Sequence, residues 1–502
     1  MEAVPKTEMA LIALVLLYFF GAMYLQNDVG LADNGDFTRA MSWVTTGPLE
    51  IEQNRPAADT DDWSRRYFNY WIPNWKLELS ATKPQTSAYL LWWPGAILNK
   101  LLYSEKVLYL PLLSVFSKLI LFAVLLLLIC WSRLESIFTK TLLVSVVVPS
   151  AFFLTSTDYF AYLNSFYQES TTFVYLLLLL VSIVLLRRRP TVLYVVLSLA
   201  CLLLIATSKP AYFYWPALAV PFIFYAWYSG RDLSLRTPAI LSINAVLIAS
   251  LTIVAQAYRH NDYQKTNAYH SLFYGSLAFS ERPAAQLEDL GIEEGAIQCL
   301  KQSAFTANGR ACLDNYREQM SHSNTIEVFM REPWVMFSTL THVLDTMQDV
   351  SLEYLGKYAI DDPRGQMRSS VPLDHSQVAQ EQRFWLPATE FGSLNLWSEL
   401  KFKWFPTGHA LLLTAIGFTA WFMAGLRRPG VHRDLAMVGL LCTITFCADM
   451  IVAILGDGTY ELIKHIFLAN VLFDIAAIAF FGSVSIWCVE HVTRMRSRGL
   501  TT

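Results

Sequence analysis

The chain has 502 residues, of which 54% are hydrophobic and only 16% are charged, and its formal net charge is −3. Soluble domains carry about 25% charged residues, so this composition excludes an ordinary soluble protein and predicts an α-helical polytopic membrane protein. The small net charge gives no reason to expect nucleic acid as a partner.

Long apolar segments recur along the chain, each close to the ~20 residues that a helix needs to cross a bilayer. They predict about ten transmembrane helices, at about residues 9–25, 106–131, 141–157, 169–186, 190–208, 211–228, 238–257, 406–426, 435–455 and 465–488. No small-residue cleavage site follows the first segment, so we expect it to be retained as a signal anchor.

Every second loop between these segments is basic. The basic loops hold Lys6, Arg133, Lys140, Arg187, Arg188, Arg189, Arg231, Arg236, Arg427, Arg428, Arg433, Arg494, Arg496 and Arg498. Because cytoplasmic loops are enriched in Lys and Arg, both termini are expected in the cytoplasm. The large loops 26–105 and 258–405 are then extracytoplasmic.

This pattern predicts three parts. Residues 1–257 form an amino-terminal membrane module with the first outer loop, 258–405 an extracytoplasmic loop domain, and 406–502 the carboxy-terminal membrane helices. Within the outer loops, 88–102 is apolar and predicts an interfacial or re-entrant helix, while 325–348 predicts amphipathic helix around a proline. Cys299 and Cys312 share the second loop and can pair if it faces an oxidising compartment.

The first polar cluster follows the first apolar segment directly and contains Asp33, Asp36 and Arg39. A carboxylate near the bilayer surface can act as a general base toward a hydroxyl, or can help to hold a divalent ion. The alternative is an Asn-Gly turn with solvated charges. The position of this cluster in the chain, on the same face as three other polar clusters, favours the functional interpretation.

Two further clusters lie at the outer ends of later segments. Asp158, Gln168 and Glu169 belong to a short hairpin, and Lys209 ends the fifth segment. Glu169 can equally be a helix cap, and Lys209 can be a lysine whose ammonium reaches the membrane surface.

The fourth cluster, Glu461, Lys464 and His465, begins the last segment, and its spacing places the three side chains on one helix face. These groups can form a local ion pair of little consequence, or the cations can bind a lipid phosphate. His270 and Tyr274, near the start of the second large loop, can bind sugar hydroxyls or simply pack. Asp474 lies deep within its segment, so we expect it to pair with another helix rather than to touch a sugar.

Four short sequences carry a resemblance to a known family: NGDFTR (34–39), NSFYQES (164–170), YHSLFYGSL (269–277) and ELIKH (461–465). With the long first outer loop, they resemble the GT-C superfamily of membrane glycosyltransferases, and more narrowly bacterial hexose transferases of cell-surface glycan assembly. The resemblance covers most of the chain, but only in short patches.

The resemblance implies a hexosyl- or pentosyltransferase of the bacterial plasma membrane. Such an enzyme moves a sugar from a polyprenyl-phosphate carrier to a glycan, lipid or protein acceptor, usually with inversion. It implies that an acid of the first outer loop is the catalytic base, a role that falls on Asp36 first and Asp33 second. Relatives place metal or phosphate ligands in the second outer loop, near Asp158 and Glu169. No DxD or ExD triplet stands there, so a divalent cation such as Mg²⁺ or Mn²⁺ stays open.

Glycosyl transfer requires a base for the acceptor proton and cations for the departing phosphate. The cations at suitable depth are Arg39, Lys209, Lys464 and His465, and the remaining substrate or metal contacts are assigned to Asp158, Gln168, Glu169, His270, Tyr274 and Glu461. The alternatives are a transporter or flippase of a glycolipid or other anion, and a lipid-linked glycan polymerase or ligase. Transporters place substrate charges near the midplane, whereas these clusters lie at one edge.

Overall fold

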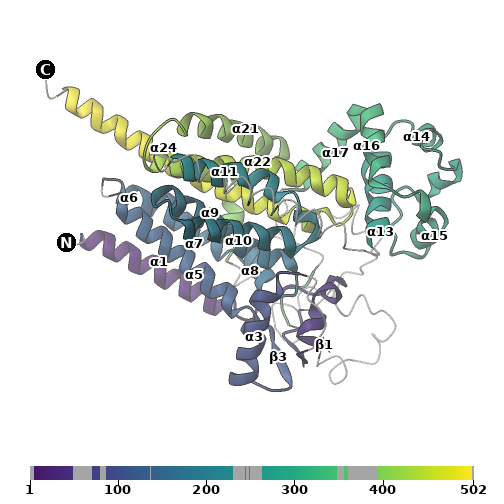
Figure 1. The fold of residues 1–502 in the computed structure, drawn as a ribbon, viewed down its shortest axis with the longest axis horizontal. Helices are drawn as coiled ribbons and strands as arrows, with labels where there is room; N and C mark the ends of the chain where they lie inside the picture. Colours follow the sequence, from purple (N-terminus) through teal and green to yellow (C-terminus); the bar gives the residue numbers. More distant parts are fainter. Residues whose placement is uncertain are drawn as a thin grey trace.

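The computed structural model describes residues 5–48, 71–79, 86–135, 137–229, 244, 248, 263–347, 355–359 and 394–499. It is a bundle of long helices, and smaller elements gather at the end of the bundle opposite to both termini (Figure 1). The helices of the bundle and its connections are α1 (Lys6–Leu25), α5 (Val115–Leu134), α6 (Thr139–Leu142), α7 (Val148–Leu154), α8 (Thr157–Leu163), α9 (Gln168–Arg188), α10 (Val192–Ser208), α11 (Trp215–Ser229), α20 (Leu396–Trp404), α21 (Gly408–Gly425), α22 (Val431–Asp457), α23 (Leu462–His465) and α24 (Phe467–Gly499).

Six helices in the described part of the chain are long and apolar enough to cross a membrane, namely α1, α5, α9, α21, α22 and α24. A seventh span is possible if the broken pair of Thr139–Leu154 and Thr157–Leu163, bent by 53°, crosses as one unit. Helices α10 and α11 occupy two more predicted segments but are shorter, at 17 and 15 residues. The predicted segment 238–257 lies outside the described residues, apart from Asn244 and Ile248. The chain is therefore a helical polytopic membrane protein.

Two predicted segments differ from the structure in their detail. The segment 106–131 was expected to be one helix, but it begins with strand β3 (Val107–Tyr109) and the short helix α4 (Leu110–Leu113), and its long helix starts only at Val115. The strand forms because β3 pairs with β2 (Asn74–Leu77), which also pairs with β1 (Thr45–Pro48), in an antiparallel sheet of order β1-β2-β3. The segment 141–157 is interrupted by the π-helical turn η5 (Leu143–Val147), so it is not a straight helix.

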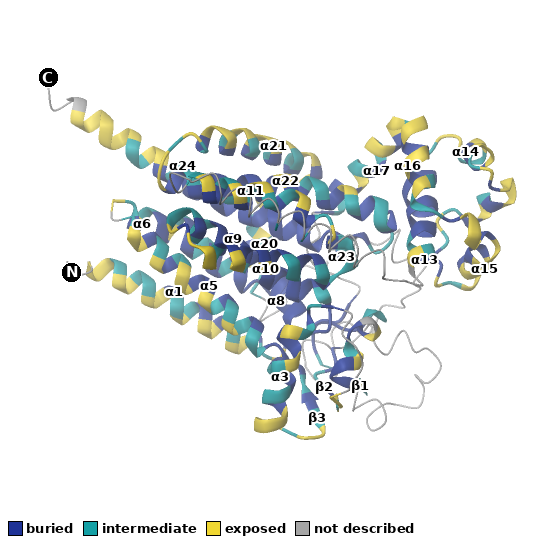
Figure 2. Cartoon of the chain, in the orientation of Figure 1, coloured by how far each residue is buried: buried dark blue, intermediate teal, exposed yellow. Residues whose placement is uncertain are grey.

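The centre of the bundle is built by α9, α22 and α24. In the most apolar window of each helix, 78% of α9 is buried, against 61% of α22 and α24 and only 17% of α1. Figure 2 shows the same gradient, with dark blue inner helices and yellow outer faces on α1 and α21. An exposed apolar face on an outer helix is what a lipid-facing surface requires.

The basic end of the bundle lies with the two termini. Arg187 and Arg188, at the end of α9, form ion pairs with the buried Asp434 near the start of α22, and Arg188 also pairs with Glu135 at 2.5 Å. Both chain ends lie on this side of the bundle in Figure 1. The arrangement agrees with the alternation of basic loops, while the side of the membrane on which this end lies stays a prediction.

The opposite end carries two smaller assemblies. One combines the sheet with η1 (Asp36–Arg39), η2 (Met41–Trp43) and α3 (Tyr89–Leu102), the helix predicted at 88–102. The other is a helical unit over 263–347, made of α13 (Tyr263–His270), η7 (Ser271–Ser276), η8 (Leu277–Phe279), α14 (Pro283–Asp289), η9 (Glu294–Cys299), α15 (Ala307–Tyr316), η10 (Arg317–Gln319), α16 (His322–Arg331) and α17 (Pro333–Thr346). A short 3-10 turn, η6 (Pro210–Tyr212), joins α10 to α11.

Two expectations for the helical unit can be compared with the structure. Cys299 and Cys312 form a disulfide with a Cα–Cα distance of 5.8 Å. The amphipathic stretch 325–348 forms α16 and α17, and the break between these helices falls at Glu332, directly before Pro333. Proline disfavours helical geometry in the preceding residue, so the corner lies where the sequence requires it.

Candidate functional site

Asp33 holds the turn that presents Asp36. Its Oδ1 accepts hydrogen bonds from the backbone N–H groups of Gly35, at 2.7 Å, and Phe37, at 3.1 Å. Gly35 has φ +96°, a left-handed conformation that glycine adopts without steric cost. Burial raises the pKa of Asp33 to about 6, although the two backbone hydrogen bonds oppose the rise. The structure therefore places Asp33 in the scaffold of the turn, with Asp36 as its more exposed carboxylate.

Asn34 ties the same turn to two distant parts of the chain. Its backbone N–H donates to the Tyr167 hydroxyl at 3.2 Å, and its side-chain Nδ2 donates to the Glu461 carboxylate at 3.2 Å. The Tyr167 hydroxyl lies 3.0 Å from both the Ala32 carbonyl and Asn34 Oδ1, the acceptors for its proton. These contacts fix the loop that follows α1 against the hairpin before α9 and against the segment before α23.

Lys464 joins the loop that follows α1 to the last membrane helices. Its Nζ forms an ion pair with Asp36 Oδ2 and a second with Glu461 Oε2 at 2.7 Å. The lysine side chain is 2% exposed, whereas those of Asp36 and Glu461 are 18% and 21% exposed. The ammonium group thus lies beneath two carboxylates that reach solvent. Glu461 has φ +45°, an uncommon conformation for a residue with a side chain, at the start of α23.

A second ion pair lies within electrostatic range of the first. Lys209, which follows α10, pairs with Glu169 of α9 at 2.6 Å. Glu169 also lies in the field of Lys464. With all five groups ionised, two lysines face three carboxylates, which leaves one net negative charge. We define Asp36, Glu169, Lys209, Glu461 and Lys464 as the charged cluster.

His465 and His270 do not join the charged cluster but meet at Asp457, the last residue of α22. His270 Nδ1 lies 2.8 Å from Asp457 Oδ1, and His465 Nε2 lies 3.0 Å from Oδ2. His270 Nε2 accepts the backbone N–H of Ala304 at 3.0 Å, so that nitrogen carries no proton. His270 is therefore the neutral Nδ1–H tautomer, donating to Asp457. At 1% exposed it links the helical unit to α22 and is not open to a ligand.

Close backbone packing accompanies this link. Gly458 follows α22 with φ +63°, and a Cβ at this position would lie 2.6 Å from the backbone nitrogen of Gly275 in η7. Tyr274 is 7% exposed, its ring lies against those of His270 and Tyr460, and burial raises the pKa of its hydroxyl. Tyr274 thus packs between the helical unit and the segment before α23.

The other predicted residues are Asp158, Gln168 and Arg39, and none of them is seen in the charged cluster. Asp158 is buried and pairs with Lys357 at 3.0 Å, with Asn395 close to the same carboxylate. Gln168 begins α9, where its carbonyl accepts the hydroxyls of two threonines of the first turn. The side chain of Arg39 lies outside the described part of the structure.

Asn164 belongs to the polar hairpin that the sequence singled out, and the structure shows that it organises the site. It donates to the Val29 carbonyl at 2.6 Å and accepts the Ser114 hydroxyl at 2.7 Å, so it joins three segments. Sequence reasoning missed Lys357 and Lys401, for which the sequence carries no local signal. Lys401 of α20 pairs with Asp474 at 2.9 Å, and Tyr159 donates to the same carboxylate. The expectation that Asp474 pairs with another helix is thereby confirmed.

The donor set was also compared with what a divalent cation needs. In the described ranges, no group of three or more His, Cys, Asp or Glu side chains converges as metal ligands would. Between Asp36 and Glu461, the point where a cation would sit is taken by the Lys464 ammonium group. These residues do not fit a metal site in this arrangement.

The fold and the site together define a polytopic helical membrane protein with a charged cluster where the last two long helices meet the loop that follows α1. Residues 2–499 match the model of the YfdI N-terminal transmembrane domain, and the chain belongs to this family. Neither the curated proteins nor the solved structures gave a match to the chain.

Proposed function

We propose that the protein is a membrane glycosyltransferase that moves a sugar from a polyprenyl-phosphate carrier to an acceptor hydroxyl at the extracytoplasmic face. The observation that carries this proposal is the contact between Asp36 and Lys464, which are 428 residues apart in sequence. It unites an acid of the first outer loop with a cation of the last helices, the two kinds of group that the reaction needs. Family membership and the GT-C resemblance of four short sequences support the same class.

Asp36 is assigned as the general base. Its side chain is partly exposed, held by a capped turn, and can accept the proton of an acceptor hydroxyl as the new glycosidic bond forms. Inversion follows if the hydroxyl attacks the anomeric carbon from the side opposite the phosphate. Asp33 supports this role through the turn, because its carboxylate is occupied by two backbone N–H groups.

Lys464 and Lys209 are assigned to the phosphate of the donor. Negative charge builds on the phosphate as the sugar leaves, and a preorganised ammonium group in a partly dry site stabilises that charge. Both lysines are held by carboxylates of the protein, at 2.7 Å for Glu461 and 2.6 Å for Glu169, so they are oriented before the donor arrives.

The position of the cluster fits a lipid-linked donor better than a transported solute. The cluster lies where α22 ends and α23 begins, at the edge of the membrane-spanning region. Within the spans, Asp474 is paired with Lys401, and Asp449 accepts the Tyr214 hydroxyl at 2.7 Å. Transporters keep substrate-binding polar groups near the midplane, whereas these carboxylates are engaged by the protein itself.

The proposal places the protein in the bacterial plasma membrane, with the helical unit and the first outer loop outside. The sugar is a hexose or a pentose, and the acceptor is a glycan, a lipid or a protein. A strain that lacks the gene should lose the mass of one sugar from a surface glycan, and the wild-type gene should restore it.

Two isosteric variants make this test specific. Asp36→Asn at wild-type protein levels should fail to restore the sugar, because an amide cannot accept the acceptor proton. Asp33→Asn should restore it, because the amide Oδ1 still accepts the two backbone N–H groups. Full restoration by Asp36→Asn would contradict the proposal.

A further inference from the structure

The corner between α16 and α17 carries large apolar side chains that no described part of the protein covers. Met330 is 77% exposed, Trp334 70%, Phe337 60% and Ile326 44%. Their spacing along the two helices places them in one stripe, and the rings of Trp334 and Phe337 lie 6.4 Å apart. We name Ile326, Met330, Trp334 and Phe337 the apolar corner. Soluble surfaces rarely expose contiguous apolar groups of this size without a partner.

The same helices have a separate charged flank. On α16, Arg331 pairs with Glu327 at 2.6 Å and lies 3.4 Å from Asp289 of α14. Arg331 directly follows Met330, so the two side chains point about 100° apart around the helix. One flank of the hairpin is therefore polar and turned toward α14, while the other is apolar.

The pair of helices α16 and α17 packs against the outer ends of the membrane helices. Ser271 hydrogen-bonds to Thr325 of α16 at 3.0 Å and to the carbonyl of Ile454, near the end of α22, at 3.3 Å. At the other end of the hairpin, a Cβ on Gly408, the first residue of α21, would lie 2.1 Å from the Leu344 carbonyl carbon and oxygen. In Figure 1, α16 lies across the end of the bundle instead of continuing the direction of α22.

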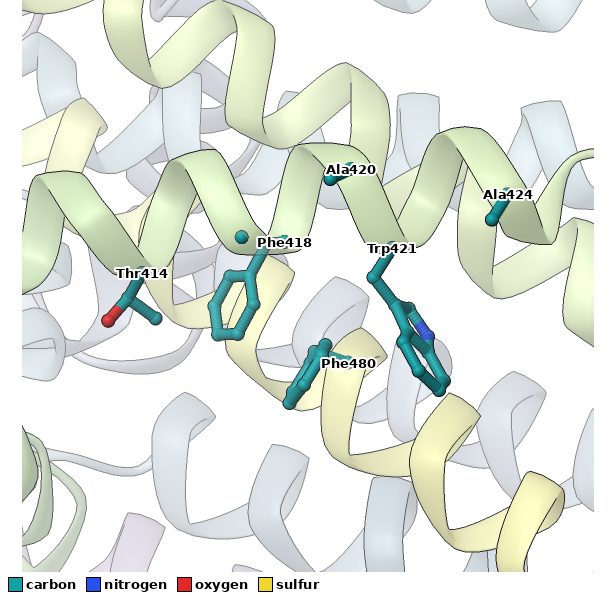
Figure 3. Close-up of a pocket in the computed structure, with 7 residues that line it drawn as sticks. Thr414, Phe418, Ala420, Trp421, Ala424 and Phe480 are labelled. Atoms are coloured by element: carbon teal, nitrogen blue, oxygen red, sulfur yellow. The ribbon is translucent and has the colours of Figure 1, made fainter.

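The apolar corner thus continues a surface that already faces lipid. Helix α21, which begins against α17, exposes Leu413, Ile416 and Met423 by 69%, 57% and 56%. An open apolar groove of about 570 Å³ lies on the same helix, lined by Thr414, Gly417, Phe418, Ala420, Trp421 and Ala424 together with Phe480 of α24. Figure 3 shows Phe418 and Trp421 of α21 beside Phe480. Hydrocarbon chains fit such a lining, and aromatic side chains such as Trp334 favour the membrane interface just beyond it.

We infer that the apolar corner is a membrane anchor that inserts into the outer leaflet of the bilayer beside α21. The occupant of this surface is lipid: acyl chains contact Met330 and Phe337, and Trp334 lies at the headgroup level. The anchor holds the helical unit flat against the membrane. Because His270 and Asp457 connect that unit to the segment before α23, the charged cluster is kept at the height of the lipid headgroups.

Collision-based spin labelling of the full chain in lipid nanodiscs tests this inference without assuming any enzymatic activity. Nitroxides are attached at Met330→Cys and Phe337→Cys, in a background where Cys130, Cys447 and Cys488 are serine. Arg331→Cys is the matched control, because it lies on α16 but on the charged flank that faces α14. Accessibility is measured to oxygen, which concentrates in lipid, and to a water-soluble nickel chelate.

The oxygen-to-nickel accessibility ratio should be several-fold higher at positions 330 and 337 than at 331. A ratio at 330 and 337 equal to that at 331 would place the corner in water and overturn the inference. Low accessibility to both probes at 330 and 337 would also overturn it, because the corner would then be covered by protein. The nanodisc lipids are a mixture of phosphatidylethanolamine and phosphatidylglycerol.

Discussion

Replacement of Lys464 by glutamine should strongly reduce transfer, for two physical reasons that the structure separates. The ammonium group contacts both Asp36 and Glu461, so the two carboxylate oxygens lie within about 5 Å of each other. Without the cation, the repulsion between the two carboxylates destabilises this arrangement of the site by about 1 to 3 kcal/mol. The lower figure is appropriate because both side chains reach solvent. Loss of the cation that stabilises the departing phosphate lowers the rate a further 10² to 10³-fold, roughly.

The assay is the initial rate of sugar transfer in membrane vesicles from the deletion strain, normalised to the amount of protein. Lys464→Arg keeps the positive charge and should retain more activity than Lys464→Gln. Arg282→Gln is the control for the loss of an ordinary ion pair, because Arg282 is 71% exposed and contacts Glu332 at 3.3 Å. Its transfer rate should match the wild type, since exposed ion pairs contribute little. A wild-type rate for Lys464→Gln would refute the role given to the charged cluster.

Three further predictions concern stability. Asp33 is buried and its pKa is raised to about 6, so its ionisation destabilises the folded state increasingly as pH rises from about 4 to 7, by roughly 3 kcal/mol at the upper end. Asp33→Asn should therefore have a higher melting temperature than the wild type at pH 8, and a smaller advantage at pH 5. A lower melting temperature of the variant at pH 8 would contradict this. Cys299 and Cys312 should resist alkylation, as measured by mass spectrometry, until a reductant is added. Serine at both positions should lower the free energy of unfolding by about 3 kcal/mol, because the disulfide closes a loop of 13 residues. Alkylation without reductant would contradict the pairing. Gly458→Ala should lower the melting temperature, because the added Cβ would lie 2.6 Å from the backbone of Gly275. Gly456→Ala is the control, because its Cβ would meet nothing within 4 Å. Equal melting temperatures of the two variants would contradict the close packing.

Apolar length and loop charge were sufficient to predict most membrane helices. The segments 169–186, 435–455 and 465–488 correspond to α9, α22 and α24, because a long apolar run has few structures available other than a helix. The same reasoning was wrong at the start of 106–131, which was predicted to be helix. An apolar run also suits a strand, and residues 107–109 form β3, which pairs with β2. A pairing partner 31 to 35 residues earlier leaves no periodic signal in the segment itself.

The candidate site was predictable only in its parts. Local sequence indicated that Asp36 and Lys464 were unusual, but their contact depends on a fold that brings the first loop to the last helices. The roles of Asp33 and His270 also depend on the tertiary structure. Asp33 receives two backbone N–H groups, and His270 has both ring nitrogens occupied, and neither environment can be read from neighbouring residues.

The central claim is that Asp36 serves in the chemical step while the lysines bind the donor. Purified wild-type protein and Asp36→Asn, both in nanodiscs, are titrated with a polyprenyl-phosphate-linked sugar, and binding and single-turnover transfer are measured on the same samples. Asp36→Asn should bind the donor at least as tightly as the wild type, because Lys464 loses one competing carboxylate, while its transfer rate falls by about 10² to 10⁴-fold. Transfer at the wild-type rate by Asp36→Asn would contradict the claim.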